Sequence, residues 1–342
     1  MEEFERIARL QQRLQQAGRA TATPAVQVKV GIGDDAAVLA FSPGTDTLVT
    51  TDTMVEGIHF LRHTLSWYDV GYKCLAASVS DIAAMGGVPA TAVLSLAVPK
   101  NLNFSALEEM YDGIAALANE FGCVVSGGDL VSTNGPIVVT STVLGCVPEG
   151  SALLRSAAQP GDTVFVTGEL GMSAAGLEVL QATVNSGQHG AAPADAEQSS
   201  LIQWHRHPQP QVAAGQILRD SGVRCCNDIS DGLASETNEI AKASQVRLRL
   251  YAQRVPMSPA LRNFARWAGQ DPLVYPLYGG EDYQLVGTAS SFTFARALAR
   301  CESVGVRLTA IGRVEAGDGV VLERENGSLE VVEARGYNHF SD

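Results

Sequence analysis

The feature that most constrains this chain is a recurring pattern in which a strand-like run of residues leads into aspartate. The β-branched run 47–51 precedes Asp52, and residues 123–126 lead through two glycines to Asp129. β-branched residues favour strands, and glycine permits tight turns. The pattern therefore predicts hard oxygen donors at the ends of strands, and it predicts that Asp52 marks such an end.

The length of the chain predicts two domains. Its 342 residues exceed the usual size of a single core, and 46% of them are apolar. Strand-like runs mix with helical ones, among them 68–85, 104–121 and 233–244, without strict βαβ alternation, which favours two α+β domains. Turn residues at 148–150 place the boundary between domains 1–150 and 151–342, and the polar run 185–200 is expected to be a flexible surface insertion without chemistry.

Charge and cysteine usage exclude several classes of protein. Lys and Arg number 24 and Asp and Glu 37, a formal charge of −13, which argues against nucleic acid or an anionic membrane as a partner. No apolar run approaches the roughly 20 residues of a membrane span, and the first sixteen residues do not resemble a secretory signal. Six scattered cysteines without Cys-x-x-Cys spacing are typical of reduced core thiols and of a cytoplasmic location.

The acidic residues that follow strands or begin helices form one candidate set of metal ligands. Each of them alone is more often a turn or cap residue. Together with neighbouring Thr and Ser hydroxyls they suit Mg²⁺, and the sequence has no His or Cys cluster for zinc or iron. Several magnesium ions on an acidic chain indicate triphosphate transfer, although neither a Walker A motif nor a protein-kinase signature is present. The aspartates of the set are Asp34, Asp35, Asp52, Asp81, Asp129, Asp228 and Asp231.

Seven short segments rich in glycine and acidic residues follow one another along the chain. They are Gly31-Ile32-Gly33-Asp34-Asp35, Thr51-Asp52-Thr53 with Gly57-Ile58-His59-Phe60, Ser80-Asp81-Ile82-Ala83-Ala84-Met85-Gly86, Gly127-Gly128-Asp129, Asp228-Ile229-Ser230-Asp231-Gly232, Gly279-Gly280-Glu281-Asp282-Tyr283 and Gly336-Tyr337-Asn338-His339-Phe340. In this order they closely resemble the thiamine-monophosphate kinase family, which is related to aminoimidazole ribonucleotide synthetase and selenophosphate synthetase. The resemblance runs from about Gly31 to Phe340.

The resemblance implies a fold and a reaction. The fold is a two-domain α+β subunit like that of aminoimidazole ribonucleotide synthetase. Its N-terminal mixed sheet forms a homodimer interface and binds ATP and metal, and its C-terminal α/β sandwich completes the cleft. The reaction is transfer of the ATP γ-phosphate to thiamine monophosphate, which gives thiamine diphosphate, with several Mg²⁺ ions.

Site residues follow from the resemblance, position by position. The implied metal ligands are Asp35, Thr50, Thr51, Asp52, Asp81, Asp129, Asp228 and Asp231, of which Asp52, Asp81 and Asp129 would be catalytic. The implied ATP contacts are Gly128, Asp129, Arg155, Ser230 and Tyr111. The implied substrate contacts are His59, Glu281 and Tyr337.

Two alternatives stay open at the level of sequence. The first is another ATP-dependent enzyme of the same superfamily with a different acceptor. Selenophosphate synthetase is disfavoured, because the reactive cysteine or selenocysteine of its N-terminal glycine-rich segment has no counterpart here. The second alternative is a catalytically silent sensor of magnesium nucleotide, which would keep the aspartates without turnover.

Overall fold

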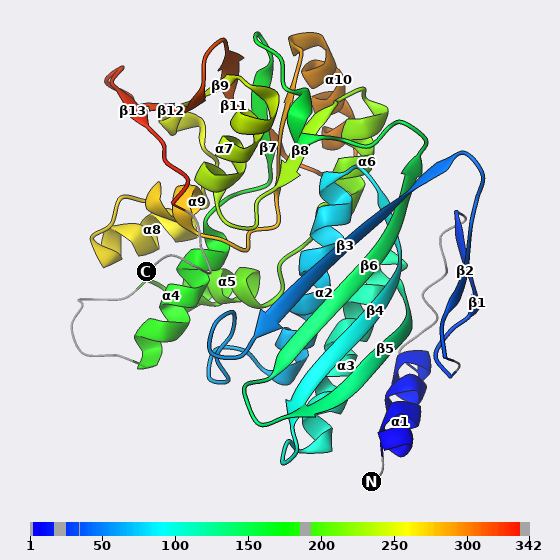
Figure 1. Cartoon of the computed structure of the whole chain (residues 1–342). Helices are drawn as coiled ribbons and strands as arrows, with labels where there is room; N and C mark the ends of the chain where they lie inside the picture. Colours follow the sequence, from blue (N-terminus) through cyan, green and yellow to red (C-terminus); the bar gives the residue numbers. More distant parts are fainter. Residues whose placement is uncertain (1–2, 17–24, 34, 185–192, 336–342) are drawn as a thin grey trace. The chain divides into compact units, whose positions relative to one another are not determined.

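The computed structural model describes residues 3–16, 25–33, 35–184 and 193–335 (Figure 1). The chain divides into two compact units: unit 1 is Met1–Ile82 with Gly87–Gly150, and unit 2 is Ala83–Gly86 with Ser151–Asp342. Each unit combines helices with a mixed sheet, which confirms the predicted two-domain α+β fold. Among the described residues, no helix is both long and apolar enough to cross a membrane.

Unit 1 is built on a four-stranded sheet with the order β3-β6-β4-β5, and β1 and β2 form a separate antiparallel pair. Strands β4 and β5 run parallel and are joined by α3, whereas the other pairs of the sheet are antiparallel. The elements are α1 (Glu3–Gln16), β1 (Val26–Val30), β2 (Val38–Phe41), β3 (Thr45–Val55), α2 (Trp67–Ala84), β4 (Val88–Pro99), α3 (Phe104–Phe121), β5 (Val124–Thr133) and β6 (Val138–Pro148).

Helices α2 and α3 lie on one face of this sheet (Figure 1). We call that the helix face and the opposite one the open face. Helix α3 has the predicted bounds because both of its ends are coded locally: the Asn103 side chain accepts a hydrogen bond from the Ser105 N–H, and Gly122 ends the helix at φ 67°. On the open face Val49 is 65% and Val131 46% exposed, so this face carries apolar side chains that are accessible among the described residues.

The prediction that Asp52 and Asp129 follow the ends of strands is wrong, since Asp129 lies inside β5, which continues to Thr133. Strand β3 continues to Val55 and pairs with β6 over its whole length, from Thr45 opposite Pro148 to Val55 opposite Val138. Asp52 therefore lies inside a strand, where successive side chains point to opposite faces of the sheet. This register decides which of its neighbours can share a site with it.

Unit 2 contains a seven-stranded sheet with the order β13-β12-β9-β11-β7-β10-β8, in which only β12 and β9 run parallel among the described pairs. Its core packs Val164, Val166, Leu248, Leu250 and Val286 of the central strands against apolar helix faces. The elements are η1 (Arg155–Ala157), β7 (Thr163–Thr167), α4 (Met172–Val184), α5 (Asp195–Arg206), α6 (Val212–Asp220), β8 (Cys225–Asp228), α7 (Leu233–Ser244), β9 (Arg247–Tyr251), η2 (Ala252–Arg254), α8 (Pro259–Ala268), α9 (Val274–Tyr278), β10 (Leu285–Ala289), α10 (Ser291–Glu302), β11 (Leu308–Glu315), β12 (Gly319–Glu323) and β13 (Leu329–Val331).

The prediction that residues 185–200 are flexible is wrong from Asp195 onward, although residues 193–200 do lie at the surface. Residues 185–192 lie outside the described part of the chain, but helix α5 begins at Asp195. Acidic residues in its first turn and His205 and Arg206 in its last turn suit the helix dipole, and Leu201 and His205 are buried. Composition alone misses such a helix because a few buried contacts outweigh a polar surface.

Candidate active site

On the helix face of unit 1, strand β3 and helix α2 bring two carboxylates together. The Thr50 hydroxyl donates to Asp81 Oδ2, and Ser78 Oγ donates to Asp52 Oδ2 at 2.8 Å. Burial, and next the charge of Asp81, raise the pKa of Asp52 from 3.8 to about 6. Two neighbouring carboxylates held by hydroxyls repel each other, and a cation between them would relieve that repulsion.

The donors of this pair fit a magnesium ion, because carboxylate and hydroxyl oxygens are the ligands that Mg²⁺ prefers. Within the described residues, no three His, Cys, Asp or Glu side chains converge closely enough to hold a metal by themselves. A hard cation at Asp52 and Asp81 would thus complete its shell with hydroxyls, water or phosphate oxygens, which leaves room for a polyphosphate.

Thr51 and Asp129 lie on the open face of the same sheet, opposite Asp52. The Thr51 hydroxyl is 3.0 Å from the Thr142 hydroxyl, and Thr53 and Thr140 form the next such pair at 2.9 Å. The strand register aligns Thr53, Thr140, Ser95 and Asp129 in one row across the sheet. The structure therefore groups Thr50, Asp52 and Asp81, and separates them from Thr51 and Asp129.

Three further predicted residues of unit 1 have different surroundings. Asp35 is exposed in the turn between β1 and β2. Gly128 lies against β4, where an added Cβ would come within 2.3 Å of the Leu94 carbonyl oxygen. Tyr111 is a core residue of α3, and burial raises its pKa to about 12. Packing alone thus explains Gly128 and Tyr111.

A tight turn after β3 orients His59. The ring Nδ1 of His59 accepts a hydrogen bond from the Val55 backbone N–H at 3.0 Å, and the backbone N–H of His59 donates to the Val55 carbonyl at 2.9 Å. A neutral ring that accepts at Nδ1 carries its proton on Nε2. The turn thus fixes the orientation of the His59 ring, and the Nε2–H of that ring is a hydrogen-bond donor.

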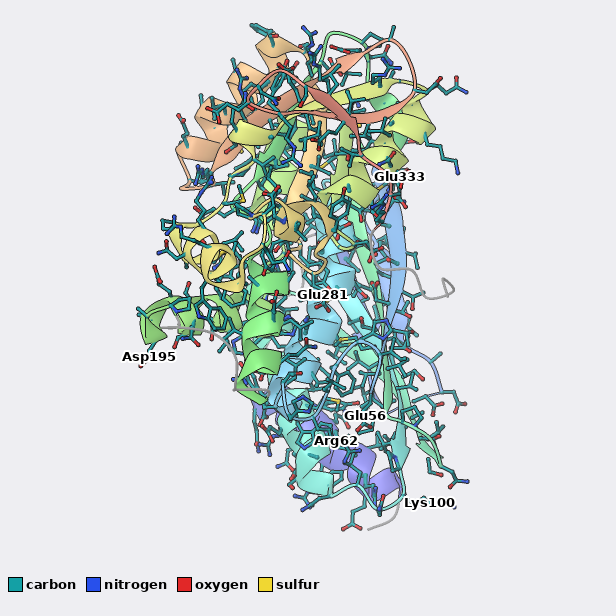
Figure 2. The ribbon with its side chains drawn as sticks, turned by 90° about the vertical axis from the view of Figure 1, so that its left-hand side faces the viewer. Glu56, Arg62, Lys100, Asp195, Glu281 and Glu333 are labelled. Carbon is teal, nitrogen blue, oxygen red and sulfur yellow. The ribbon has the colours of Figure 1, made fainter. Side chains whose placement is uncertain are left out.

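A salt bridge between Glu56 and Arg62 joins the two ends of that turn (Figure 2). The Arg62 guanidinium binds both carboxylate oxygens of Glu56, with Nη2 to Oε2 at 3.1 Å, and stacks 5.5 Å from the Trp67 ring centre. Glu56 Oε2 also accepts from the Ile137 N–H at 3.2 Å. These contacts, led by the bonds from Arg62, lower the pKa of Glu56.

In unit 2, the two predicted ligand loops are hydrogen-bonded to each other. The Glu281 N–H donates to the Ser230 carbonyl at 2.6 Å, and the Tyr283 N–H donates to the Ile229 carbonyl at 2.9 Å. An added Cβ at Gly280 would come within 2.5 Å of the Ser230 carbonyl oxygen, so glycine permits this close approach. The predicted nucleotide loop and the predicted substrate loop therefore form one assembly.

Glu281 adopts a backbone conformation that is uncommon for its residue type, with φ 67°. Such a conformation persists where the surroundings enforce it, and it is often found at functional sites. His205 Nδ1 lies 3.7 Å from Glu281 Oε2 and 3.1 Å from Ser173 Oγ. Both contacts use the same ring nitrogen, so these three residues do not have the geometry of a nucleophile triad.

Two residues that the sequence analysis missed, Asn227 and Glu236, connect the predicted ligands of unit 2. Glu236, 3% exposed, accepts hydrogen bonds from the Asp231 N–H at 3.1 Å and from the Ser230 hydroxyl at 3.3 Å. Burial, and next the charge of Glu239, raise its pKa to about 7. An acidic residue in the first turn of α7, soon after Asp231, was the available signal, but it also suits ordinary helix capping.

Asn227 joins this cluster to Arg155, which lies seventy-two residues earlier in the chain. Arg155 Nε donates to Asn227 Oδ1 at 2.9 Å, and its Nη1 pairs with Glu239 Oε2 at 2.9 Å. The neighbouring Asp228 is 2% exposed at the end of β8. Arg155, Asp228, Ser230 and Asp231 are thus brought together, whereas Tyr337 lies outside the described residues.

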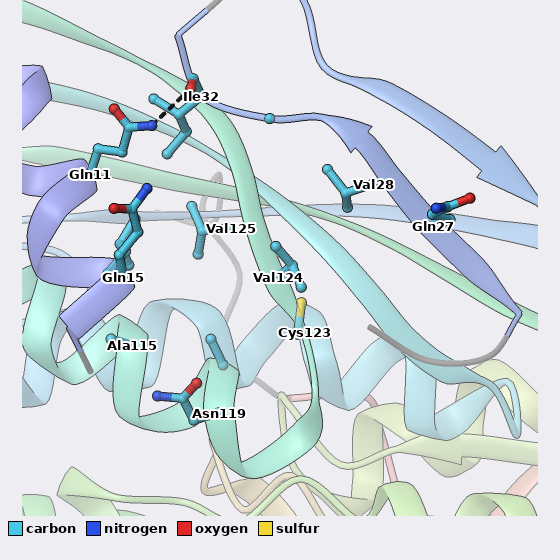
Figure 3. A pocket seen from close by; sticks show the side chains of 13 residues that line it. Gln11, Gln15, Gln27, Val28, Ile32, Ala115, Asn119, Cys123, Val124 and Val125 are labelled. Carbon is cyan, nitrogen blue, oxygen red and sulfur yellow. Dashed lines mark hydrogen bonds between the residues drawn. The ribbon is translucent and has the colours of Figure 1, made fainter. Parts of the chain in front are cut away.

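A pocket of about 570 Å³ opens elsewhere in unit 1, between α1, β1, α3 and β5 (Figure 3). Gln11, Gln15, Gln27 and Asn119 supply its polar groups, and Gln11 Nε2 donates to the Ile32 carbonyl at 2.9 Å. Its lining contains no charged side chain and none of the predicted site residues among those described. It is therefore a poor place for a triphosphate.

Comparison with known proteins gives the family. Residues 33–147 match the model of the AIR synthase related protein N-terminal domain, and residues 159–325 match that of the C-terminal domain. The thiamine-monophosphate kinase of Bacillus subtilis is 42% identical over 92% of this chain and 94% of its own length. That of Escherichia coli K12 is 37% identical over 92% of this chain and 93% of its own length.

Solved structures agree with the sequence matches. The thiamine-monophosphate kinase of Stenotrophomonas maltophilia aligns with a TM-score of 0.81, 33% identity and 98% coverage of both chains. AaThiL complexed with AMPPCP and TMP aligns with a TM-score of 0.76 and 32% identity, over 88% of this chain and 89% of that one. The chain therefore belongs to the AIR synthase related family and, within it, to the thiamine-monophosphate kinases.

Proposed function

We propose that this protein transfers the γ-phosphate of ATP to thiamine monophosphate and releases ADP and thiamine diphosphate. The observation that carries the proposal is 42% identity, over nearly the full length of both chains, to a thiamine-monophosphate kinase. A structural relative that was solved with AMPPCP and TMP supports the same pair of substrates. The Asp52 and Asp81 pair supports a reaction that needs cations beside phosphate groups.

The chemistry asks for little acid–base catalysis from the protein. A terminal phosphate oxygen of thiamine monophosphate is anionic near neutral pH and attacks the γ-phosphorus directly. The bond to the oxygen of ADP breaks as the new bond forms, and that oxygen leaves as part of ADP. The chain therefore has to position two anions in line and offset their repulsion, which is the usual task in phosphoryl transfer.

Several magnesium ions, when bound, would neutralise charge on the triphosphate. We assign their ligands in groups: Thr50, Asp52 and Asp81 on the helix face, Thr51 and Asp129 on the open face, Asp35 in the turn between β1 and β2, and Asp228 and Asp231 in unit 2. Hydroxyls that already bind the Asp52 and Asp81 carboxylates support the first group on the helix face. The burial of Asp228 beside the Ser230 loop supports the group in unit 2.

Contacts to the two substrates complete the proposal. Arg155 and Ser230 would bind the nucleotide, and the always ionised Arg155 suits a phosphate oxygen. Gly128 would allow close approach of the nucleotide. Tyr111 is the least supported of the proposed nucleotide contacts, because its side chain is buried. The proposed contacts to the acceptor are His59, through its Nε2–H, and Glu281 and Tyr337. A cytoplasmic location is part of the proposal, and the burial of all six cysteines supports it.

One assay tests the proposed activity. Purified protein with ATP, Mg²⁺ and thiamine monophosphate should form ADP and thiamine diphosphate in equal amounts. Asp52→Ala and Asp81→Ala should each lower turnover by at least about a hundredfold, because each removes a charged group beside the transferring phosphate, while their circular dichroism stays that of the wild type. Nucleotide binding without product would identify a silent sensor instead.

A further inference from the structure

Glu236 and Asn227 form a buried relay beneath the exposed side chain of Arg155. Both relay residues are nearly inaccessible, at 3% and 2% exposure, whereas half of the Arg155 side chain is exposed. Neither of them is among the residues assigned above to metal, nucleotide or acceptor. Buried polar side chains with several partners fix the orientation of the groups that they contact.

The direction of each hydrogen bond in the relay is set by chemistry. Glu236 Oε1 accepts from the Asp231 N–H, which can only donate, and from the Ser230 hydroxyl. Glu236 Oε2 then accepts from Asn227 Nδ2 at 2.5 Å, and Glu239 Oε2 accepts from the same nitrogen at the much longer distance of 3.5 Å, so the bond to Glu236 dominates. With its amide nitrogen held there, Asn227 has to present Oδ1 on its other side, where Arg155 Nε donates to it at 2.9 Å.

We propose that Glu236 is a positioning residue for nucleotide binding, which acts on Arg155 by fixing the orientation of the Asn227 amide. The proposal rests on the nucleotide contact proposed above for Arg155. The Arg155 guanidinium has a second partner in the half-exposed Glu239, so loss of the relay would leave the charge in place and remove its fixed orientation.

The substitution Glu236→Gln changes the direction of the hydrogen bond to Asn227 while the volume of the side chain stays nearly the same. A glutamine that keeps its oxygen toward the Asp231 N–H turns its amide nitrogen toward Asn227 Nδ2, so that two donors face each other. Asn227 can avoid this by turning its amide over, but then Nδ2 faces Arg155 Nε and that hydrogen bond is lost. The acid and the amide have nearly the same shape, so the effect comes from hydrogen-bond direction.

The experiment measures binding of ATP with Mg²⁺ by isothermal titration calorimetry, for the full chain and its variants, at a pH well above 7 so that the Glu236 carboxylate, whose pKa is about 7, is ionised. Glu236→Gln should weaken binding about fivefold, and it should weaken the Arg155→Ala variant further by less than about twofold, because residues in one hydrogen-bond network are coupled. Asn227→Ala removes the acceptor of Arg155 directly and should match Glu236→Gln, so it replaces that variant if the glutamine protein does not fold.

Asn238→Ala is the matched control. Asn238 lies on the same helix and donates to the Ala234 and Val332 carbonyls, outside the relay. Its loss should lower the melting temperature without changing ATP affinity. The proposal is overturned if a folded Glu236→Gln protein binds ATP as the wild type does, if its effect is undiminished in the Arg155→Ala background, or if Asn238→Ala weakens binding equally.

Turnover of thiamine monophosphate by the same wild-type preparation tests the proposed function separately. A wild type that binds ATP and shows the coupling, but forms no thiamine diphosphate, would refute the reaction and leave the relay standing. A wild type with turnover but no coupling would refute the relay alone.

Discussion

At the scale of single residues, the position of ionised Asp52 beside Asp81 lowers the stability of the folded protein. Its pKa rises from 3.8 to about 6 in the folded protein, so the folded state binds the proton more tightly than the unfolded state does. The contribution of Asp52 to stability is therefore present at low pH, and it is lost as the pH rises from about 4 through 6. A bound cation would offset the loss, which links metal binding to folding.

Asp52→Asn should accordingly be more stable than the wild type in EDTA at pH 7.5, and its advantage should be about 1 kcal/mol larger there than at pH 5. The asparagine oxygen can still accept from Ser78, so the packing is kept. Urea unfolding of both proteins at the two pH values measures the difference. An Asp52→Asn protein less stable than the wild type at pH 7.5 would contradict the account of the carboxylate pair.

Glu281 gives a second test at this scale, because its positive φ of 67° suits glycine better than glutamate. Glu281→Gly should keep or raise stability, by up to about 1 kcal/mol, while the KM for thiamine monophosphate rises at least severalfold. Gln245→Gly is the control, since Gln245 has φ 55° at the end of α7 and no assigned role. Equal KM values for the two variants would argue against a substrate contact at Glu281.

At the scale of the element, strand β5 distinguishes two adjacent glycines. A Cβ at Gly128 would lie 2.3 Å from the Leu94 carbonyl oxygen, whereas the nearest atom to a Cβ at Gly127 is 3.8 Å away. Gly128→Ala should therefore cost about 1 to 3 kcal/mol of unfolding free energy through overpacking, and Gly127→Ala less than about 1 kcal/mol. Thermal unfolding in the absence of nucleotide separates this packing effect from any loss of ATP binding, and equal melting temperatures would refute it.

The helices and strands were predictable from sequence where residues within or next to the element determine its ends. The bounds of α3 match the expected residues because a capping side chain, a terminal glycine and apolar spacing all lie within or next to the segment. Helix α7 also matches its expected bounds, although Gly232 at its start supplies no side-chain cap, so its apolar spacing alone was the signal. The end of β3 was not predictable in this way, since its partner β6 lies about ninety residues further along the chain. The link from the relay to Arg155 could not be predicted for the same reason, because the hydrogen bond between Arg155 and Asn227 joins residues seventy-two positions apart.

At the scale of the whole molecule, we propose that the open face of the unit 1 sheet is the interface of a homodimer. Val49 and Val131 are exposed there among threonine side chains, a surface that suits burial against a second copy. Val49→Lys should shift the protein from dimer to monomer in sedimentation velocity runs, because it would place charge inside the interface. Val304→Lys, at a similarly exposed valine of unit 2, should leave the mass unchanged. A wild-type monomer would contradict the proposal.

Strand β3 presents Asp52 to the helix face and Thr51 to the open face, so its length matters as much as its composition. Inserting or deleting one residue between Thr45 and Asp52 would exchange the two faces, turning the aspartate away from Asp81 and a neighbouring threonine, Thr51 or Thr53, into its place. The same change in a surface loop would alter little. Over evolutionary time, β3 can therefore tolerate substitutions more readily than changes in length. An insertion or deletion in this strand persists only if a second one in the same strand restores the register.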